Sequence, residues 1–172
     1  MLNQLLGAFE LVGGALRPIA ARWETATLVV VDMQPAFFPQ IDSDVLQQVS
    51  REICRAMRRG LPIVIVETKP HINGPTFRSL ANLVKDYDRV GFARKRGMNG
   101  SRAILAVCRQ RAFDVSRFRV CGVYTHYCVE ETAVGLGQRR RSADVYVVKR
   151  ACADPGGNNW SAFPLMANVF LV

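Results

Sequence analysis

The sequence predicts an α/β protein: a three-layer, doubly wound sheet, mostly parallel, with helices on both faces. Short apolar runs rich in β-branched residues, such as Thr27–Val31 and Leu61–Val66, are typical of strands buried on both faces. Between such runs, the segments 42–59 and 101–111 have apolar residues at helical spacing. Strands that alternate with amphipathic helices indicate βαβ units, which build a parallel sheet.

The same patterns predict the other elements in order. Residues 2–12 have apolar positions at helical spacing, and Gly13, Gly14 and Pro18 interrupt them. We therefore expect residues 1–25 to form an N-terminal helical segment and residues 26–172 a single domain. Further strands are expected at 90–94, 117–123, 144–148 and 169–172, a loop at 69–75, a helix over 128–138 and weak helical character over 161–168.

Size and composition limit the possible functions. A chain of 172 residues that is 49% hydrophobic and 22% charged suits one soluble domain with a full core. The net charge of +9 is spread along the chain, and the one dense basic run, 139–141, lies at a predicted helix end where cations suit the dipole. We therefore expect a basic enzyme without a nucleic-acid partner. No apolar run is long enough to span a membrane.

The cysteines indicate the cellular compartment. Five cysteines are an odd number, and no pair has C-x-x-C spacing, so neither a disulfide framework nor a zinc site is expected. The N-terminus lacks the basic start and cleavage site of a signal peptide. These features favour a reducing, cytoplasmic location.

The segment 120–133 carries the clearest chemical signal. It is predicted as a buried strand, a tight turn and a helix that begins at or next to Cys128. A thiol at a helix N-terminus faces unpaired N–H groups and the positive end of the helix dipole, which favour the nucleophilic thiolate. With a base and a cation beside it, Cys128 is a candidate nucleophile; without them, it is a small buried residue.

Two charged residues also follow predicted strands. Asp32 comes directly after the strand 27–31, and Lys95 follows the strand 90–94. In open parallel sheets, functional sites form beyond the carboxyl ends of the strands, which makes both residues candidates. Position alone leaves alternatives open: Asp32 also suits a turn or a helix cap, and any member of the cluster 94–96 can serve as the cation.

Three motifs resemble the isochorismatase-like cysteine hydrolases, a family that includes nicotinamidases and N-carbamoylsarcosine amidases. The motifs are VVVDMQPAFF at 29–38, Lys95 before Gly100-Ser101 and a helix, and GVYTHYCV at 122–129 followed by Thr132-Ala133. The resemblance extends from about residue 26 to near the C-terminus. The lysine motif departs from the family pattern, because the aromatic residue usual after the lysine is missing or replaced by Met98.

The resemblance implies a catalytic triad and a reaction. Cys128 is the expected nucleophile, Asp32 the base and Lys95 the nearby cation, acting on a C–N bond of a small amide-like substrate through a thioester. The family usually has a cis peptide bond at the position of Val123–Tyr124. There the backbone N–H groups of Tyr124 and Cys128 are expected to form an oxyanion hole.

Residues near these motifs are candidates for a substrate pocket. Gln34, Phe37, Phe38 and Tyr127 are expected to line it, although aromatic residues near strand ends also occur in cores and Gln34 can instead bond its own loop. His126 is expected to have no chemical role. Homo-oligomers, dimers or tetramers, are common among relatives, and a neighbouring subunit can supply a lid over the site.

The chain also departs from nicotinamidases. These relatives hold a divalent metal with Asp-x-His and a further histidine, whereas residues 67–75 offer one carboxylate, one histidine and a lysine. We therefore expect neither a metal nor another cofactor, and not a nicotinamidase. Two alternatives remain: an isochorismatase-type reaction on a vinyl ether, and a non-catalytic binding or assembly module whose positive charge serves an anionic partner.

Overall fold

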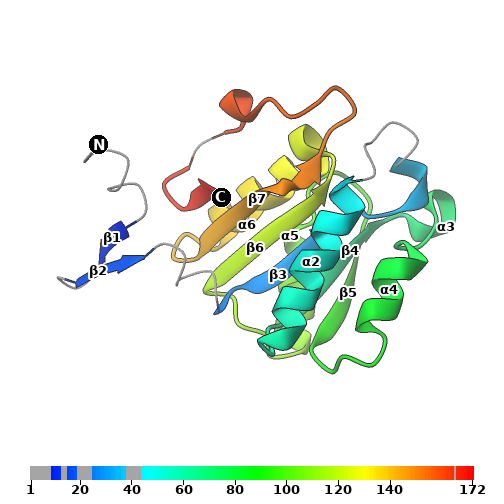
Figure 1. The fold of residues 1–172 in the computed structure, drawn as a ribbon, viewed down its shortest axis with the longest axis horizontal. Coiled ribbons are helices and arrows are strands. Elements are labelled where there is room, and N and C mark those ends of the chain that lie inside the picture. Colours follow the sequence, from blue (N-terminus) through cyan, green and yellow to red (C-terminus); the bar gives the residue numbers. More distant parts are fainter. Residues whose placement is uncertain (1–8, 13–14, 19–24, 38–43, 165) are drawn as a thin grey trace.

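A computed structural model describes residues 9–12, 15–18, 25–37, 44–164 and 166–172. Its centre is a six-stranded sheet in the order β5-β4-β3-β6-β7-β8, and all neighbouring pairs are parallel (Figure 1). The chain winds outward from β3 in one direction and from β6 in the other, so the order reverses between these two strands. The strands are β3 (Thr27–Val31), β4 (Ile63–Thr68), β5 (Val90–Lys95), β6 (Arg117–Val123), β7 (Asp144–Ala153) and β8 (Val169–Leu171).

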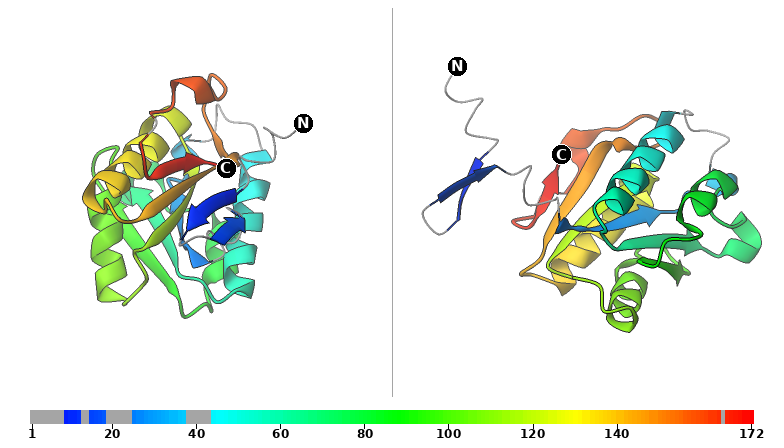
Figure 2. Two further views of the ribbon diagram at one scale, coloured as in Figure 1. Left: turned by 90° about the vertical axis from the view of Figure 1, so that its left-hand side faces the viewer. Right: turned by 60° about the horizontal axis from the view of Figure 1, so that its bottom comes forward.

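Helices cover both faces of this sheet, which confirms the predicted three-layer α/β fold (Figures 1 and 2). On one face lie α2 (Asp44–Arg58) and α4 (Arg78–Val84), which contact each other. On the other lie α5 (Ser101–Gln110) and α6 (Glu130–Arg139). The carboxyl ends of the strands therefore stay uncovered by these helices.

Burial explains why the apolar patterns fold in this way. All five residues of β3 are buried, as expected for a central strand with helices on both faces. On α2, the buried apolar residues Val45, Val49, Ile53 and Ala56 recur every three or four positions and so form one stripe. This stripe packs α2 onto the sheet and fixes the helix over β3, β6 and β7.

The N-terminal prediction is wrong where the structure describes it. Residues Phe9–Val12 form strand β1, which pairs antiparallel with β2 (Ala15–Pro18), instead of a helix. Short apolar segments fit helical and strand periods equally well, and the glycine pair at 13–14 is a sequence typical of a hairpin turn. Residues 1–8 and 19–24 lie outside the described residues.

Other differences concern boundaries and short helices. The expected loop after β4 contains α3 (Pro70–Asn73), and α4 was not predicted because seven residues are too few to show a clear helical period. β7 extends five residues beyond the predicted strand, and a single 3₁₀ turn, Trp160–Ala162, replaces the weak helix. Among the described residues, no helix has the length and apolar character required to cross a membrane.

Candidate active site

The predicted site residues meet where the strand order reverses. Asp32 directly follows β3, Lys95 ends β5, and the turn that carries Cys128 follows β6. The backbone of Asp32 has a positive φ of 51°, a conformation that Asp tolerates better than most residues. This sharp change of direction ends the strand and leaves Asp32 buried just beyond the carboxyl end of β3.

Gly122 allows β6 to approach β3 closely at this point. Its φ is 124°, and a Cβ atom there would overlap the carbonyl group of Val31. The register of β6 against β7 also shifts between Val120 and Gly122. A residue without a side chain is therefore required to bring the turn after β6 beside Asp32. The peptide bond that follows, Val123–Tyr124, is cis.

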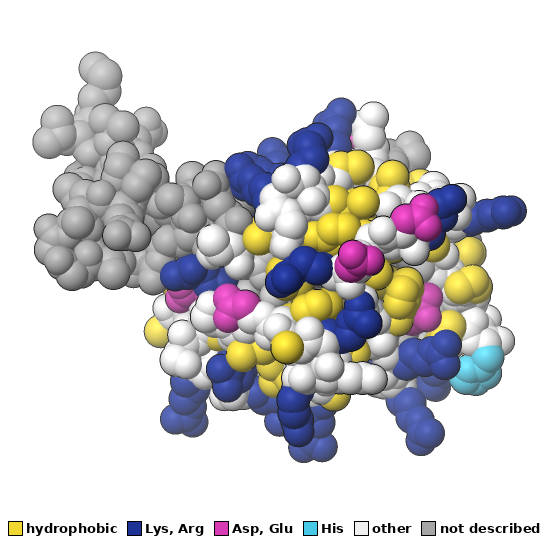
Figure 3. All heavy atoms as spheres, turned by 90° about the horizontal axis from the view of Figure 1, so that it is seen from below, with side chains coloured by type: hydrophobic (Ala, Val, Ile, Leu, Met, Phe, Trp, Pro, Cys, Tyr) yellow, Lys and Arg dark blue, Asp and Glu magenta, His cyan; other side chains and the backbone are white. Residues whose placement is uncertain are grey.

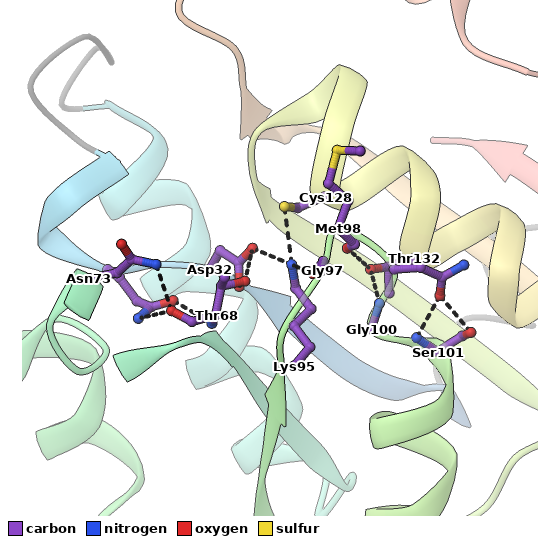
Figure 4. Close-up of polar contacts among 12 residues, drawn as sticks. Asp32, Thr68, Asn73, Lys95, Gly97, Met98, Gly100, Ser101, Cys128 and Thr132 are labelled. Atoms are coloured by element: carbon purple, nitrogen blue, oxygen red, sulfur yellow. Dashed lines mark hydrogen bonds and ion pairs between the residues drawn. The ribbon is translucent and has the colours of Figure 1, made fainter. Parts of the chain in front are cut away.

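The Lys95 ammonium group lies between the acid and the thiol (Figure 4). Its Nζ atom is 2.7 Å from Asp32 Oδ2, 3.1 Å from Cys128 Sγ and 3.0 Å from the carbonyl oxygen of Gly97. An ammonium group has three donors, and here each has an acceptor. The side chains of Lys95 and Asp32 are only 2% and 1% exposed, so solvent screens this pair weakly.

Thr68, a residue that the sequence did not single out, holds the Asp32 carboxylate. Its hydroxyl lies 3.0 Å from both carboxylate oxygens and donates to them. The carbonyl group of Thr68 accepts a hydrogen bond of 2.8 Å from Asn73 in α3. The only available signal was its place at the end of β4, beside the strand that leads into Asp32. Thr68 therefore orients the acid toward Lys95 and Cys128.

Cys128 lies one turn into a helical segment rather than at its first residue. A π-helical turn, Thr125–Val129, precedes α6, so the helical segment begins three residues earlier than predicted. Burial raises the pKa of the Cys128 thiol to about 11, and the charge of Asp32 and a hydrogen bond to it act in the same direction. Lys95 opposes these effects without overcoming them.

The raised pKa corrects the expectation that the helix start favours a thiolate. The Lys95 charge is shared with the Asp32 carboxylate at 2.7 Å, so it only partly offsets burial of the sulfur. A thiol with a pKa near 11 is protonated at neutral pH. A reaction at this sulfur therefore requires a base to remove the proton.

The segment after Lys95 is fixed by α6. The hydroxyl of Thr132 accepts a hydrogen bond of 3.0 Å from the N–H group of Gly100. Nearby, Asn99 Oδ1 accepts from the N–H and hydroxyl groups of Ser101 at 2.9 and 2.6 Å. These bonds hold the backbone that presents the Gly97 carbonyl to Lys95.

The rings of Phe37 and Tyr127, two of the residues expected to line a pocket, both pack against Tyr124, which comes just before the turn that carries Cys128. The rings of Phe37 and Tyr124 are 5.7 Å apart, edge to face, and the Tyr124 hydroxyl donates to the Phe37 carbonyl at 2.9 Å. Tyr127 is 6.4 Å from Tyr124 and is 53% exposed. Phe38 lies outside the described residues.

Gln34 does not line a pocket in the structure. It is fully buried, and its amide nitrogen donates to the carbonyl groups of Thr68 and Gly74, at 3.2 and 2.5 Å. Its amide oxygen accepts from the N–H group of Thr68 at 2.7 Å. The side chain therefore holds the end of β4 and the loop after it, rather than lining a pocket or bonding its own loop.

His126 lies in the π-helical turn before α6 and connects this turn to the loop after β7. Its backbone N–H donates to Asp154 at 2.8 Å, and its ring Nε2 accepts from the N–H group of Asn159 at 3.0 Å. The other ring nitrogen lies 3.4 Å from Glu130. These contacts orient the ring toward its own helix and the loop.

The residues after β4 do not fit a metal site. Both hydrogen bonds to Glu67 come from Thr76, at 2.8 Å from its N–H group and 2.9 Å from its hydroxyl, and the carboxylate is buried. Lys69 adds a positive charge at the neighbouring position, and His71 is exposed. In the described part of the chain, no three His, Cys, Asp or Glu residues are grouped to hold an ion.

The fold and this site define an α/β protein with an acid, an amine and a thiol in contact at the switch point of a parallel sheet. The Isochorismatase domain model matches residues 26–169, so the chain belongs to the isochorismatase family. A search of curated proteins found no significant match.

Solved structures share the fold at low sequence identity. MAR1 ribonuclease from Caenorhabditis elegans is 21% identical with a TM-score of 0.66, over 77% of this chain and 66% of that chain. The nicotinamidase SaPncA from Staphylococcus aureus is 17% identical with a TM-score of 0.65, and the match covers 77% of this chain and 86% of that chain. N-carbamoylsarcosine amidase from Thermoplasma acidophilum is 18% identical with a TM-score of 0.65, over 86% and 95%.

Proposed function

We propose that this protein hydrolyses a C–N bond of a small amide-like substrate through a thioester on Cys128. The observation that carries the proposal is the buried Lys95 ammonium group in contact with both the Asp32 carboxylate and the Cys128 sulfur. A structural cysteine has no need of a buried ion pair beside it, and burying two charges is costly. The contact therefore favours a catalytic over a purely structural role for these residues.

The first half of the reaction begins from the neutral thiol. Asp32 takes the thiol proton as the sulfur attacks the substrate carbonyl carbon, and Lys95 stabilises the carboxylate and the developing sulfur anion. The backbone N–H groups of Tyr124 and Cys128 donate to the oxygen of the tetrahedral intermediate. The C–N bond then breaks, and Asp32 returns the proton to the departing nitrogen.

Water completes the reaction. Asp32, again a carboxylate, takes a proton from a water molecule as the water oxygen attacks the thioester carbon. The C–S bond breaks, the acid product leaves, and the Cys128 sulfur recovers the proton from Asp32. Thr68 keeps the same carboxylate oriented in both halves, because its hydroxyl contacts both oxygens.

The aromatic side chains suggest the shape of the substrate. Phe37, Tyr124 and Tyr127 form a group of aromatic rings around the turn that leads to Cys128, which suits a small molecule with a planar or apolar part. Gln34 is not among these residues, because its amide is used by Thr68 and Gly74. The homo-oligomer remains a prediction for a sizing experiment.

A panel of small primary amides and ureido acids tests the proposal through ammonia release. The wild-type protein is expected to hydrolyse at least one member, and Cys128→Ala, Asp32→Asn and Lys95→Met to lose that activity. Cys54→Ala is the matched control, because it removes another partly exposed thiol, on α2, away from the triad. It is expected to keep full activity.

Two results would count against this function. Hydrolysis that survives in Cys128→Ala would exclude the thioester and favour a reaction that does not use the cysteine. A folded wild-type protein that hydrolyses no member, and whose Cys128 is never acylated by an activated ester, would favour the non-catalytic module.

A further inference from the structure

A hollow lined by charged side chains lies beside α2, separate from the candidate active site. It has a volume of about 450 Å³, within the range of small-molecule sites. Its described lining residues are five arginines and one glutamate: Arg51, Arg55, Arg58, Arg59 and Arg150, with Glu52. None of these lining residues has an apolar or aromatic side chain.

The arginines of α2 are spaced so that they share one side of the helix. Arg51 and Arg55 are four residues apart, Arg58 follows Arg55 by three, and Arg59 lies in the turn directly after the helix. Side chains at these spacings are neighbours on a helix surface, and like charges there lower helix stability. Arg55 and Arg58 lie in the last turn of α2, where positive charge suits the helix dipole, so the helix tolerates a dense group of guanidinium groups beside the hollow.

Glu52 orients Arg150, the residue of β7 that lines the hollow. Its side chain is 2% exposed, and its two oxygens bind Arg119 Nε at 2.6 Å and Arg150 Nη2 at 2.9 Å. Although burial alone raises the pKa of Glu52, its hydrogen bonds and ion pairs with Arg119 and Arg150 lower it overall, so this carboxylate is charged and already engaged. The Arg150 side chain remains 60% exposed, so it is oriented and still accessible.

We propose that this hollow binds a compact polyphosphate anion, such as a chain of linked phosphates or the phosphate end of a nucleotide. Guanidinium groups donate two parallel hydrogen bonds to phosphate oxygens, and several of them match a ligand with several adjacent charges. The lining has no aromatic side chain on which a base can stack and no apolar side chain to insert into a membrane. The phosphates themselves are therefore the recognised group.

The surface as a whole suits an anionic ligand. In the view from below, Lys and Arg side chains are spread around the outline of the molecule and across this face, with fewer acidic side chains among them (Figure 3). Such a field attracts anions before contact. The net charge of +9, which the hydrolase proposal leaves without a role, then has one.

Calorimetric titration of the full-length protein with inorganic tripolyphosphate, at low and at physiological salt, tests the proposal. Binding is expected, and it should weaken as salt rises because the contacts are charged. The double variant Arg51→Glu/Arg58→Glu should bind at least about tenfold more weakly, since it reverses two of the charges around the ligand. Arg51→Gln/Arg58→Gln, which keeps the helix without reversing charge, should show a smaller loss in the same direction.

The matched control is Arg78→Glu/Arg109→Glu, which changes the net charge equally on α4 and α5. It should change the affinity less than about twofold if the hollow is the site. A second titration with ATP separates the sources: equal affinities point to a phosphate chain, and tighter binding of ATP to a nucleotide.

Three results would overturn the proposal: no binding of either compound, equal losses in the control and in the α2 variants, or binding of a single-stranded oligonucleotide without binding of either small anion. Circular dichroism of each variant establishes that it is folded before its affinity is compared. Amide hydrolysis by the α2 variants is expected to be unchanged, because the hollow does not include the triad.

Discussion

Cys128 should react slowly with iodoacetamide at neutral pH and faster as the pH rises. Burial, followed by the charge of Asp32, raises the pKa of this thiol from 9.0 to about 11. Each unit is a factor of ten in thiolate, so about one hundredth of the ordinary thiolate fraction is present at pH 7. The alkylation rate should therefore increase about tenfold per pH unit up to pH 10 or so, without a plateau.

Two substitutions test the causes of this shift separately. Asp32→Asn removes the carboxylate charge that raises the pKa of Cys128, so the midpoint should move to lower pH and alkylation at pH 7 should accelerate. Lys95→Met removes the opposing positive charge, so the midpoint should move to higher pH. Amide hydrolysis should be lost in both variants. Asp32→Asn leaves a more ionised sulfur without its base, and Lys95→Met removes the positive charge that stabilises the carboxylate and the developing sulfur anion.

The assay follows the Cys128 peptide by mass spectrometry over a range of pH, in a Cys54→Ser background that removes the other partly exposed thiol. A plateau of the wild-type rate below pH 8 would show a preformed thiolate and refute the base-assisted mechanism. A midpoint that rises in Asp32→Asn would refute the assigned cause of the shift.

Three further predictions concern stability and positioning. Gly122→Ala should lower the free energy of unfolding by about 2–5 kcal/mol in urea titrations, because its Cβ meets the Val31 carbonyl and its φ is 124°; a loss below about 0.5 kcal/mol would contradict this. Thr68→Val should lower kcat/KM about tenfold while Thr68→Ser retains it, since only serine keeps the hydroxyl that holds Asp32; equal kinetics in both would exclude the positioning role. Burial raises the pKa of Cys108 to about 11 and of Cys152 to about 12. The stabilisation that depends on these thiols being neutral should therefore be fully present below about pH 9, and the free energy of unfolding should fall as the pH rises toward 11. A free energy of unfolding that rises across that range in denaturant titrations would contradict this.

Sequence patterns were sufficient for the sheet and its main helices because burial repeats at fixed periods. The apolar run at 27–31 matches β3 residue for residue, and the periodic segment 101–111 matches α5 within one residue. Short segments were not predicted correctly, because four residues fit either period, as Phe9–Val12 shows. Asp32, Lys95 and Cys128 were chosen from the family resemblance, because position near a strand end left alternatives open, and the structure brings their side chains into contact.

Other features depend on contacts between distant residues. Thr68 was missed because nothing in its local sequence shows that its hydroxyl lies against Asp32, thirty-six residues earlier. Gln34 was misplaced for the same reason, since Thr68 and Gly74 complete its hydrogen bonds from another loop. The thiol pKa was expected to fall with the helix dipole, but burial of the sulfur and the nearby carboxylate have the larger effect.

Trapping the covalent intermediate on Cys128 tests the central claim most directly. A short reaction with an activated ester is stopped with acid, and the acylated peptide is identified by mass spectrometry in the wild type and in Asp32→Asn and Cys128→Ala. The acyl group should be on Cys128 in the wild type, accumulate on Cys128 in Asp32→Asn because no base then activates the water that cleaves the thioester, and be absent from this peptide in Cys128→Ala. Acylation spread over surface lysines, with Cys128 unmodified while substrate is consumed, would contradict the claim.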